Sequence, residues 1–357
     1  MEAAEEFVGT RAVAPAHAFD IAALERYLRG RIPEWQGAIA VEQFRGGQSN
    51  PTYKLTAGAR HYVLRRKPPG KLLPSAHAVE REFRVISALA KTDVPVPRTY
   101  CLCEDDTIIG TAFYVMEFVA GRVLWDPALP GMSPRQRRAT FDAMNRTIAA
   151  LHTVDHLNAG LGDFGKPGNY FARQIDRWSR QYKASETEPI DAMDRLIDWL
   201  PHHIPPDERT SIVHGDYRLD NLVFHPTEPE VLAVLDWELS TLGHPMADFS
   251  YHMMAWRLGG DEFRGLRGAD LAALGIPSEA EYIDQYLERA GANRPTPEQW
   301  SFYLAYNLFR LAAILQGVMA RAVAGNAASA RAIDAGKRAR PIAALGWKEI
   351  ERSFAGA

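Results

Sequence analysis

The stretch that decides the fold reads Ile212-Val213-His214-Gly215-Asp216-Tyr217-Arg218-Leu219-Asp220-Asn221-Leu222-Val223-Phe224. An apolar run enters a polar loop with the pattern His-x-Asp-x-x-x-x-Asn, and a second apolar run leaves it. A third apolar run follows shortly afterwards and ends on Asp236. Short apolar runs bounded by polar residues are typical of buried strands. A β-hairpin would therefore bring the polar ends of these runs side by side.

These polar groups match the requirements of phosphoryl transfer from ATP. One carboxylate must orient the acceptor hydroxyl and accept its proton, while an amide oxygen and a second carboxylate hold the magnesium ion that bridges the phosphates. The pattern predicts Asp216 as the catalytic base and Asn221 with Asp236 as the Mg²⁺ ligands. An H-G-D turn or a strand-ending Asp also occurs by chance in many folds, so the hypothesis rests on their combination.

Composition narrows the possible classes of protein. The chain has 357 residues, a formal net charge of -3 and 46% hydrophobic residues, which suffices for a core in two lobes. The near-neutral charge argues against a primary nucleic-acid binder. The two cysteines, Cys101 and Cys103, lack the spacing of a metal site and suit a reducing compartment. The acidic start lacks the apolar core of a signal peptide, so we expect a cytoplasmic protein.

One long apolar segment, from Trp300 to Ala324, needs a separate interpretation. Asn307, Arg310, Gln316 and Arg321 interrupt it. A membrane span of about 20 residues tolerates few such groups. We therefore expect a buried core helix and no membrane association.

Alternating apolar and polar residues predict a small β-rich region before residue 120. Between two of its strands lies the loop Gly46-Gly47-Gln48-Ser49-Asn50. Glycines allow backbone amides to approach phosphates closely, and Ser49 and Asn50 add polar contacts. A plain hairpin turn also explains this loop, because it matches neither G-x-G-x-x-G nor a Walker loop.

A basic strand end at residues 63–67 supplies the next candidates. Kinases place a cation here to hold the phosphates and pair it with a glutamate on the next helix. Arg65 follows the strand most directly, and Lys67 shares its face by the two-residue period. On the predicted helix that follows, Glu82 is the first choice for the ion-pair partner and Glu80 the second.

The strand at residues 113–119 has the position of a kinase hinge. An adenine ring would bond to the backbone around Glu117, Phe118 and Val119, although an ordinary core strand with a turn fits equally well. The hinge divides the chain into an N-terminal lobe, residues 1–120, and a helical C-terminal lobe, residues 121–357.

Helical periodicity dominates the second lobe. Ser133-Pro134 opens one helix with a capping serine and an early proline. In the loop Gly243-His244-Pro245-Met246-Ala247-Asp248, Asp248 either caps the following helix or braces the H-G-D loop, and a structural role is favoured. Aromatic residues are candidates for the walls of an acceptor pocket, although such residues more often belong to a core: Trp125, Trp178, Tyr251 and Trp256.

The order of these motifs resembles the aminoglycoside phosphotransferase-like family of small-molecule kinases, from about Asp20 to Arg321. Its strongest marks are His214-Gly215-Asp216 with Asn221, Leu235-Asp236-Trp237-Glu238, and Gly243-His244-Pro245 with Asp248. Two more stretches, Phe44 to Tyr53 and Tyr62 to Gly70, are similar to the kinase-like domain found ahead of acyl-CoA dehydrogenases in animals and to its free-standing bacterial relatives.

The resemblance implies an α+β, two-lobed protein-kinase-like fold, with a small antiparallel β N-lobe carrying one main helix and a larger, mostly helical C-lobe. It implies ATP and Mg²⁺ as cofactors and the hydroxyl of an acyl-CoA, notably a 4-hydroxyacyl-CoA, as the acceptor. Arg65, positioned by Glu82, would steady the phosphates, His214 would brace the loop, and Arg218 would balance charge near Asp216. An acyl-CoA dehydrogenase is the partner that the resemblance suggests, although no flavin or dehydrogenase domain fits in this chain.

Two departures from protein-kinase patterns bear on regulation and substrate. Arg65 stands where a lysine is typical, and Asp236 is followed by Trp237-Glu238 instead of Phe-Gly. With no recognisable activation loop, we expect a constitutively formed site and a small-molecule acceptor. The basic residues Arg65-Arg66-Lys67, together with Lys71, could bind the phosphates of CoA. A solvated position is nevertheless favoured for Arg66 and Lys71.

Two alternatives stay open at this point. The chain could phosphorylate an aminoglycoside, a choline-like amine or a sugar, and a cationic acceptor would need acidic residues such as Glu238, Asp261 and Glu262. It could also be a pseudokinase that binds a nucleotide without turnover.

Overall fold

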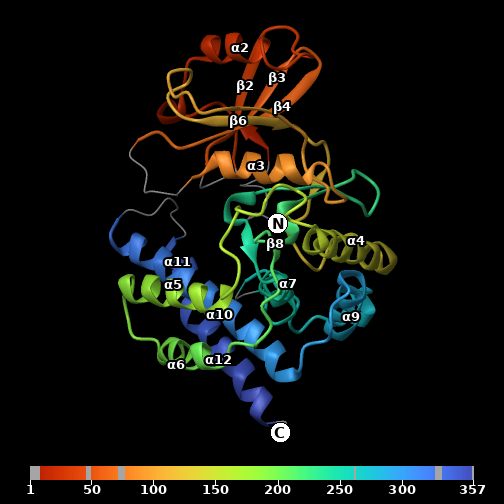
Figure 1. The fold of residues 1–357 in the computed structure, drawn as a ribbon, viewed down its shortest axis with the longest axis vertical. Helices are drawn as coiled ribbons and strands as arrows, with labels where there is room; N and C mark the ends of the chain where they lie inside the picture. The colour runs from red at the N-terminus through yellow and green to blue at the C-terminus, as the bar shows by residue number, and fades with distance from the viewer. Residues whose placement is uncertain (1–8, 46–49, 71–76, 261–262, 326–331, 356–357) are drawn as a thin grey trace. The chain divides into compact units, whose positions relative to one another are not determined.

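The computed structural model describes residues 9–45, 50–70, 77–260, 263–325 and 332–355, which form two compact units (Figure 1). The described residues of Met1–Trp125 with Asp220–Ser240 make the first unit, and those of Asp126–Leu219 with Thr241–Ala357 make the second. The boundary near residue 125 is close to the predicted hinge. The predicted single boundary between residues 120 and 121 does not account for residues 220–240, which belong to the first unit.

A six-stranded antiparallel sheet, in the order β1-β2-β3-β4-β6-β5, forms the frame of the first unit (Figure 1). Its strands are β1 (Thr10–Arg11), β2 (Ile39–Phe44), β3 (Thr52–Ala57), β4 (Arg60–Arg66), β5 (Thr99–Cys103) and β6 (Phe113–Glu117). The predicted alternation is clearest in β3, where Tyr53, Leu55 and Ala57 are buried and the residues between them are not. One face of the sheet thus forms the core of this unit.

Two helices accompany this sheet, α2 (Ile21–Arg29) and α3 (Val79–Leu89). Asp20 caps α2, because its Oδ1 accepts a hydrogen bond of 2.9 Å from the N–H of Ala23. The helix α3 lies along β5 and β6 and buries Glu82 among its apolar residues. The sequence therefore brings one ionisable side chain into the core, where it needs partners.

A small three-stranded sheet, in the order β10-β9-β7, explains why residues 220–240 belong to the first unit. It consists of β7 (Arg122–Val123), β9 (Leu222–Phe224) and β10 (Val231–Val234). A side chain at Gly121 would lie 2.3 Å from the carbonyl oxygen of Phe224, so only glycine allows this close approach. Pairing of β7 with β9 attaches the hairpin to the end of the predicted hinge.

Helices dominate the second unit, and a two-stranded sheet pairs β8 (Ser211–Val213) with β11 (Thr241–Gly243). The predicted helix at Ser133 begins with a capping box between Ser133 and Gln136. The helices are α4 (Pro134–Thr153), α5 (Tyr170–Ala184), α6 (Asp191–Trp199), α7 (Pro245–Met253), α8 (Leu271–Leu274), α9 (Glu279–Ala290), α10 (Pro297–Val323), α11 (Ala332–Gly336) and α12 (Ala339–Ala355).

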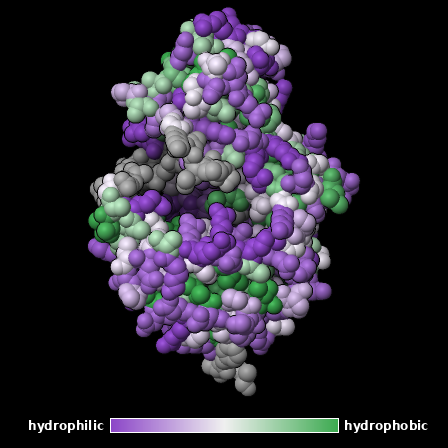
Figure 2. Space-filling view, turned by 60° about the vertical axis from the view of Figure 1, so that its left-hand side comes forward, coloured by the Kyte–Doolittle hydropathy of each residue, from purple (hydrophilic) through white to green (hydrophobic). Residues whose placement is uncertain are grey.

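The helix α10 is long and apolar enough to cross a membrane, but most of it is buried in the second unit. The prediction of a core helix for this segment is confirmed. In Figure 2 the visible face is largely hydrophilic, and hydrophobic residues appear on it in small groups. Together, the sheet with α3 and the larger helical unit confirm the predicted α+β, protein-kinase-like fold class.

Candidate active site

Arg65, on β4, is the centre of a charged cluster in the first unit. Its Nε lies 3.0 Å from Oε2 of Glu82, and its Nη2 lies 2.7 Å from Oδ1 of Asp236 and 3.1 Å from Oε2 of Glu238. Burial lowers the pKa of Arg65, but the carboxylates of Asp236 and Glu82 outweigh burial and hold this pKa above its ordinary value. Arg65 is therefore a permanent, buried cation surrounded by acids.

Glu82 is the most enclosed acid of this cluster, with 1% of its surface exposed. Its Oε1 accepts a hydrogen bond of 2.9 Å from Nδ2 of Asn50, and its Oε2 accepts one of 3.2 Å from the hydroxyl of Tyr114. Burial raises the pKa of Glu82 to about 7, and Arg65 offsets only part of this effect. The predicted Arg65–Glu82 pair is present, and fully buried Asn50 holds Glu82 instead of extending into a phosphate loop.

The other residues of the basic strand end have different partners. Lys67 pairs with Glu80 at 2.9 Å, so the second-choice glutamate belongs to the second cation. The expectation of a solvated Arg66 is wrong, because Arg66 is 2% exposed and its Nε donates to Oγ1 of Thr111 at 3.0 Å. The two-residue period of a strand predicts that Arg65 and Lys67 point to one face and Arg66 to the other. Both faces of β4 are buried here, so Arg66 is buried as well.

The β9–β10 hairpin brings Asn221 and Asp236 together, as its polar ends predicted. Leu222 pairs with Val234, and the N–H of Leu235 donates to the carbonyl oxygen of Asn221 at 2.8 Å. Asp236 has a φ of 64°, in the left-handed region that residues other than glycine rarely adopt. Such conformations cluster at functional sites, where the surrounding structure imposes them.

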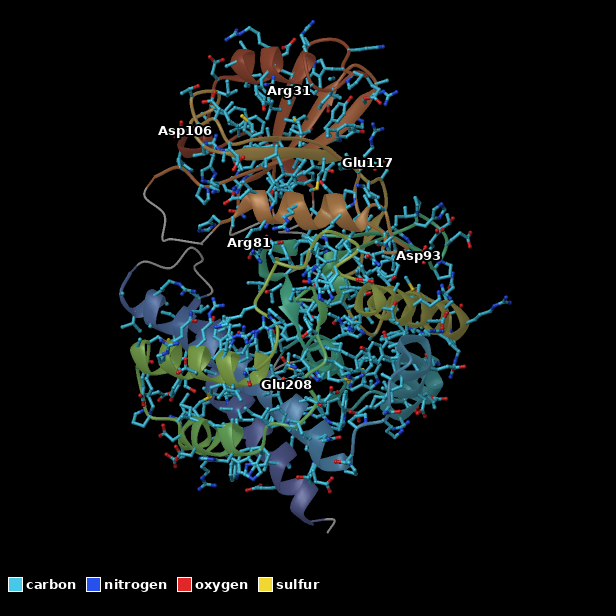
Figure 3. All side chains as sticks on the ribbon, in the orientation of Figure 1. Arg31, Arg81, Asp93, Asp106, Glu117 and Glu208 are labelled. Carbon is cyan, nitrogen blue, oxygen red and sulfur yellow. The ribbon has the colours of Figure 1, made fainter. Side chains whose placement is uncertain are left out.

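A cavity of about 530 Å³ opens beside this cluster, within the size range of small-molecule sites. The predicted hinge residues Glu117, Phe118 and Val119 line it, and Figure 3 labels Glu117 at the end of β6. Its polar lining includes Arg65, Asp220, Asn221 and Asp236, and its apolar lining includes Phe44, Val63, Ile86, Met116, Val223 and Val234. Apolar walls with a charged end suit a nucleotide, whose base is flat and whose phosphates are anionic.

The donor set of the cluster fits Mg²⁺. Arg65 contacts three carboxylates, those of Glu82, Asp236 and Glu238. Asp236 and Asn221 offer hard oxygen donors, and Mg²⁺ is typically held by one or two carboxylates together with water and substrate phosphates. These two residues would hold the ion.

The H-G-D loop presents Asp216 in the second unit, with its side chain 20% exposed. Arg218 lies 2.9 Å from Oδ1 through Nε and donates to Oδ2 through Nη2 at 3.2 Å. The hydroxyl of Tyr251 donates to Oδ1 at 2.6 Å. A partly exposed carboxylate held in this way is suited to accept a proton from a hydroxyl placed against it.

Asp248 braces this loop from beneath. Its two oxygens accept the N–H groups of His214 at 2.7 Å and Gly215 at 2.8 Å, and Nε2 of His152 lies 3.2 Å away. Burial opposes ionisation, but the interactions with His152 and the loop outweigh it and hold the pKa of Asp248 below its ordinary value. His214 adds a brace of its own, because its Nδ1 accepts the N–H of Asp216 at 3.2 Å. Of the two predicted roles for Asp248, the structure therefore shows the brace.

Arg310 is a loop partner that the sequence analysis missed. It lies in α10, where it appeared only as an interruption of an apolar segment, and its Nη2 donates to the carbonyl oxygen of Gly215 at 2.7 Å. Its guanidinium lies over the rings of Tyr251 at 5.1 Å and Trp178 at 5.7 Å. The available signal was the charge itself, because a cation in a core helix requires a specific partner.

The four aromatic candidates for an acceptor pocket have different surroundings. Trp125 lines the cavity of the first unit. Trp256 donates from its Nε1 to the carbonyl oxygen of Pro277 in the core, and Trp178 is also largely buried. Tyr251 alone contacts Asp216, as a hydrogen-bond donor.

Several predicted residues cannot be placed in the same way. Glu238 contacts Arg65 in the first unit. The others lie outside the described residues: Gly46, Gly47, Gln48, Ser49, Lys71, Asp261 and Glu262.

Comparison with known sequences identifies the family. The pattern of the phosphotransferase enzyme family matches residues 40–303, a range that includes Arg65, Asp216, Asn221 and Asp236. The chain belongs to this family. The predicted resemblance is thereby confirmed, and a phosphotransferase activity follows from family membership.

Curated relatives are similar along nearly the whole chain. Mouse acyl-CoA dehydrogenase family member 10 is 50% identical over 95% of this chain and 32% of its own length. Human acyl-CoA dehydrogenase family member 11 is 40% identical over 96% of this chain and 44% of its own length. This chain thus spans less than half the length of either relative.

Solved structures agree with the fold. A candidate aminoglycoside phosphotransferase from Ralstonia eutropha JMP134 has a TM-score of 0.87 and 60% identity, covering 94% of this chain and 99% of that one. Choline kinase from Cryptosporidium parvum Iowa II has a TM-score of 0.63 at 14% identity, covering 94% and 97%. An aminoglycoside phosphotransferase in a ternary complex with ADP and hygromycin B has a TM-score of 0.58 at 16% identity, covering 91% and 99%. The last two show the fold alone.

Proposed function

We propose that this phosphotransferase uses ATP and Mg²⁺ to phosphorylate a hydroxyl group of a small molecule. The observation that carries the proposal is the Arg65 cluster beside the cavity of the first unit. A permanent cation and the Asn221–Asp236 pair beside it are the groups that ATP phosphates with their metal ion require. The apolar walls and the hinge residues beside them suit an adenine ring.

Each residue has a distinct role in this proposal. Asp216 orients the acceptor hydroxyl and takes its proton, and Arg218 and Tyr251 hold the carboxylate in position. Arg65 steadies the phosphates, and Asn221 with Asp236 holds Mg²⁺, whose charge stabilises the transferring phosphoryl group. Catalysis would then consist of positioning and electrostatic stabilisation.

For the acceptor, we propose an acyl-CoA that carries a hydroxyl group, of the 4-hydroxyacyl-CoA type. Support comes from the named relatives, which are acyl-CoA dehydrogenase family members and match 95% and 96% of this chain. Their additional length leaves room for a separate dehydrogenase activity in those proteins. An acyl-CoA dehydrogenase acting with this chain is part of the same proposal.

The test is ADP release with Mg²⁺ and ATP across a panel of hydroxyacyl-CoAs, choline, sugars and aminoglycosides. We expect turnover on a hydroxyacyl-CoA, reduced by about 10²- to 10⁴-fold in Asp216→Asn, since removal of a general base has effects of this size. Nucleotide binding to the variant is the control and should stay close to wild type. Turnover on another acceptor would reject the acyl-CoA assignment, and ATP binding without turnover on any acceptor would reject the kinase.

A further inference from the structure

Arg310 is a buried cation in the second unit, and the reaction proposed above does not use it. It lies in α10 and is 6% exposed. Within the part of the chain that the structure describes, Arg310 forms no ion pair. A charged side chain in a protein core is costly unless specific partners compensate for the lost water. The partners of Arg310 therefore indicate its role.

The first contact of Arg310 is with the backbone of the H-G-D loop. Its Nη2 donates to the carbonyl oxygen of Gly215 at 2.7 Å. This carbonyl belongs to the peptide that joins Gly215 to Asp216, and the N–H of the same peptide donates to Nδ1 of His214 at 3.2 Å. Gly215 has a φ of 83°, and glycine imposes little conformational preference of its own. Arg310 and His214 thus hold one planar peptide from both ends, which fixes the position of the Asp216 Cα.

The second contact is with the aromatic ring that orients the carboxylate of Asp216. The guanidinium of Arg310 lies 5.1 Å from the centroid of the Tyr251 ring, and the hydroxyl of Tyr251 donates to Oδ1 of Asp216 at 2.6 Å. A cation is attracted to the face of an aromatic ring, and the ring of Trp178, at 5.7 Å, provides a second such contact. Arg310 therefore contacts two groups that place Asp216, one on its backbone side and one on its side-chain side.

The helix that carries Arg310 is fixed to the helix that carries Tyr251. On α10, Asn307 is fully buried, and its Nδ2 donates to the carbonyl oxygen of Ala247 at 2.9 Å and to Oγ of Ser250 at 2.8 Å, both on α7 (Figure 1). Asn307 and Arg310 are three residues apart, so they lie on one face of α10. Arg310 therefore reaches the loop from a helix that is already held in place.

We propose that Arg310 is a positioning residue that holds Asp216 in the orientation required for phosphoryl transfer. It acts through the carbonyl group of Gly215 and the ring of Tyr251. A displacement of about 1 Å at a catalytic group lowers the rate by about a hundredfold, so loss of these contacts should be visible in turnover. The inference rests on the role of Asp216 as the base in the proposed function.

The test is Arg310→Met, which keeps the apolar contacts of the side-chain stem but removes the charge and the donors. We expect kcat to fall by between about tenfold and a hundredfold, with an unchanged KM for ATP. Loss of the hydrogen bond to Gly215 and removal of a buried charge affect stability in opposite directions, so the unfolding midpoint should stay close to that of wild type. Arg310→Lys keeps a charge and a donor, and its kcat should lie between those of Arg310→Met and wild type.

Gln316→Met is the matched control on the same helix. Gln316 is 2% exposed, and its Nε2 donates to the carbonyl oxygen of Ser185 at 3.1 Å and to Oγ1 of Thr187 at 2.6 Å. This variant also loses buried hydrogen bonds from α10, but neither partner belongs to the H-G-D loop. Its kcat should therefore equal that of wild type.

Amide hydrogen exchange of the full chain provides a measurement that does not depend on turnover. In Arg310→Met, exchange at the N–H of Asp216 should accelerate by about tenfold, because the peptide is then held at one end only. The amides of α10 should remain as protected as in wild type. Faster exchange along α10 as well would indicate local unfolding of the helix and would contradict a positioning role.

Three further results would overturn the proposal. The first is a kcat of Arg310→Met equal to that of wild type. The second is an equal loss of kcat in Arg310→Met and Gln316→Met, which would indicate general damage to α10. The third is unchanged exchange at Asp216. An absence of wild-type turnover on every acceptor is a different failure, because it rejects the proposed function and leaves hydrogen exchange to decide whether Arg310 holds the loop.

Discussion

The two units hold their key charged residues in opposite ways. In the first unit, Arg65 is buried and contacts the carboxylates of Glu82, Asp236 and Glu238. In the second unit, Asp216 is partly exposed and is held by Arg218. The first arrangement places several acids around one buried cation, whereas the second fixes the direction of a single carboxylate.

This difference follows from what each unit would bind. Phosphates and a metal ion bring large charges, so they need a site that holds fixed charges of its own. A neutral hydroxyl brings no charge, so for the carboxylate of Asp216 correct orientation matters more than a strong electrostatic field. We therefore expect changes in the first unit to act on nucleotide binding and on pH dependence, and changes in the second to act on turnover.

Among variants that keep Asp216, the largest effect should come from Asp248→Asn in the second unit. The amide is uncharged and can accept at one oxygen only, so one of the loop N–H groups at His214 and Gly215 loses its acceptor. We expect turnover to fall by about 10²-fold through loop displacement, and the unfolding free energy to fall by about 3 kcal/mol. Steady-state kinetics and urea denaturation measure the two losses. A large loss of nucleotide affinity instead would remove the contrast between the units.

In the first unit, Arg65→Lys should weaken nucleotide binding by between about tenfold and a hundredfold. An ammonium group cannot contact Glu82 and Asp236 through separate, fixed nitrogens as the guanidinium does. Isothermal titration with Mg²⁺ and ADP measures the loss. Arg66→Lys is the matched control, because Arg66 is also buried on β4 but bonds to Thr111, so nucleotide affinity should be unaffected. Equal losses in both variants would point to general damage to β4.

Glu82 should make the stability of the protein depend on pH. Its pKa of about 7 lies above the ordinary 4.5, so the native state binds this proton more tightly than the unfolded chain does. The stabilisation is complete below pH 4.5 and is lost as the pH rises to 7, by on the order of 3 kcal/mol. Glu82→Gln cannot titrate, so the difference in unfolding free energy between wild type and variant should change across this range. A constant difference would contradict the raised pKa of buried Glu82.

The smallest effect should come from Tyr251→Phe, which removes the 2.6 Å hydrogen bond to Asp216 and leaves the ring in place. We expect kcat to fall by about tenfold with an unchanged KM for ATP, because the carboxylate loses one positioning donor of about 1.5 kcal/mol. Tyr282→Phe is the control, since its hydroxyl contacts the ring of His252. A change in the KM for ATP would show that Tyr251 acts on the first unit.

The sequence analysis was correct where the residues concerned lie in elements that are close together in the sequence. Asn221 and Asp236 were paired correctly because a hairpin of adjacent strands brings their positions together. Glu82 was chosen for Arg65 because motif order and helix periodicity placed it in the next buried element. Arg66 was misplaced because strand alternation indicates two faces and does not reveal that both are covered.

Long-range contacts explain the remaining errors and omissions. Tyr251 is 35 residues from Asp216, and Arg310 is 95 residues from Gly215. Neither residue type identifies its partner, because a tyrosine or an arginine in a helix has many acceptors available.

The sequence by itself determined the family, the α+β fold class and the identities of Asp216, Asn221, Asp236 and Arg65 as candidates, because these depend on residue type, spacing and strand or helix period. Only the tertiary structure decided that three carboxylates share Arg65, that Asp248 braces the loop and that Arg310 bonds to the carbonyl oxygen of Gly215. Burial and hydrogen-bond geometry are properties of how elements pack, and packing sets which charges lose water and which donors lose acceptors.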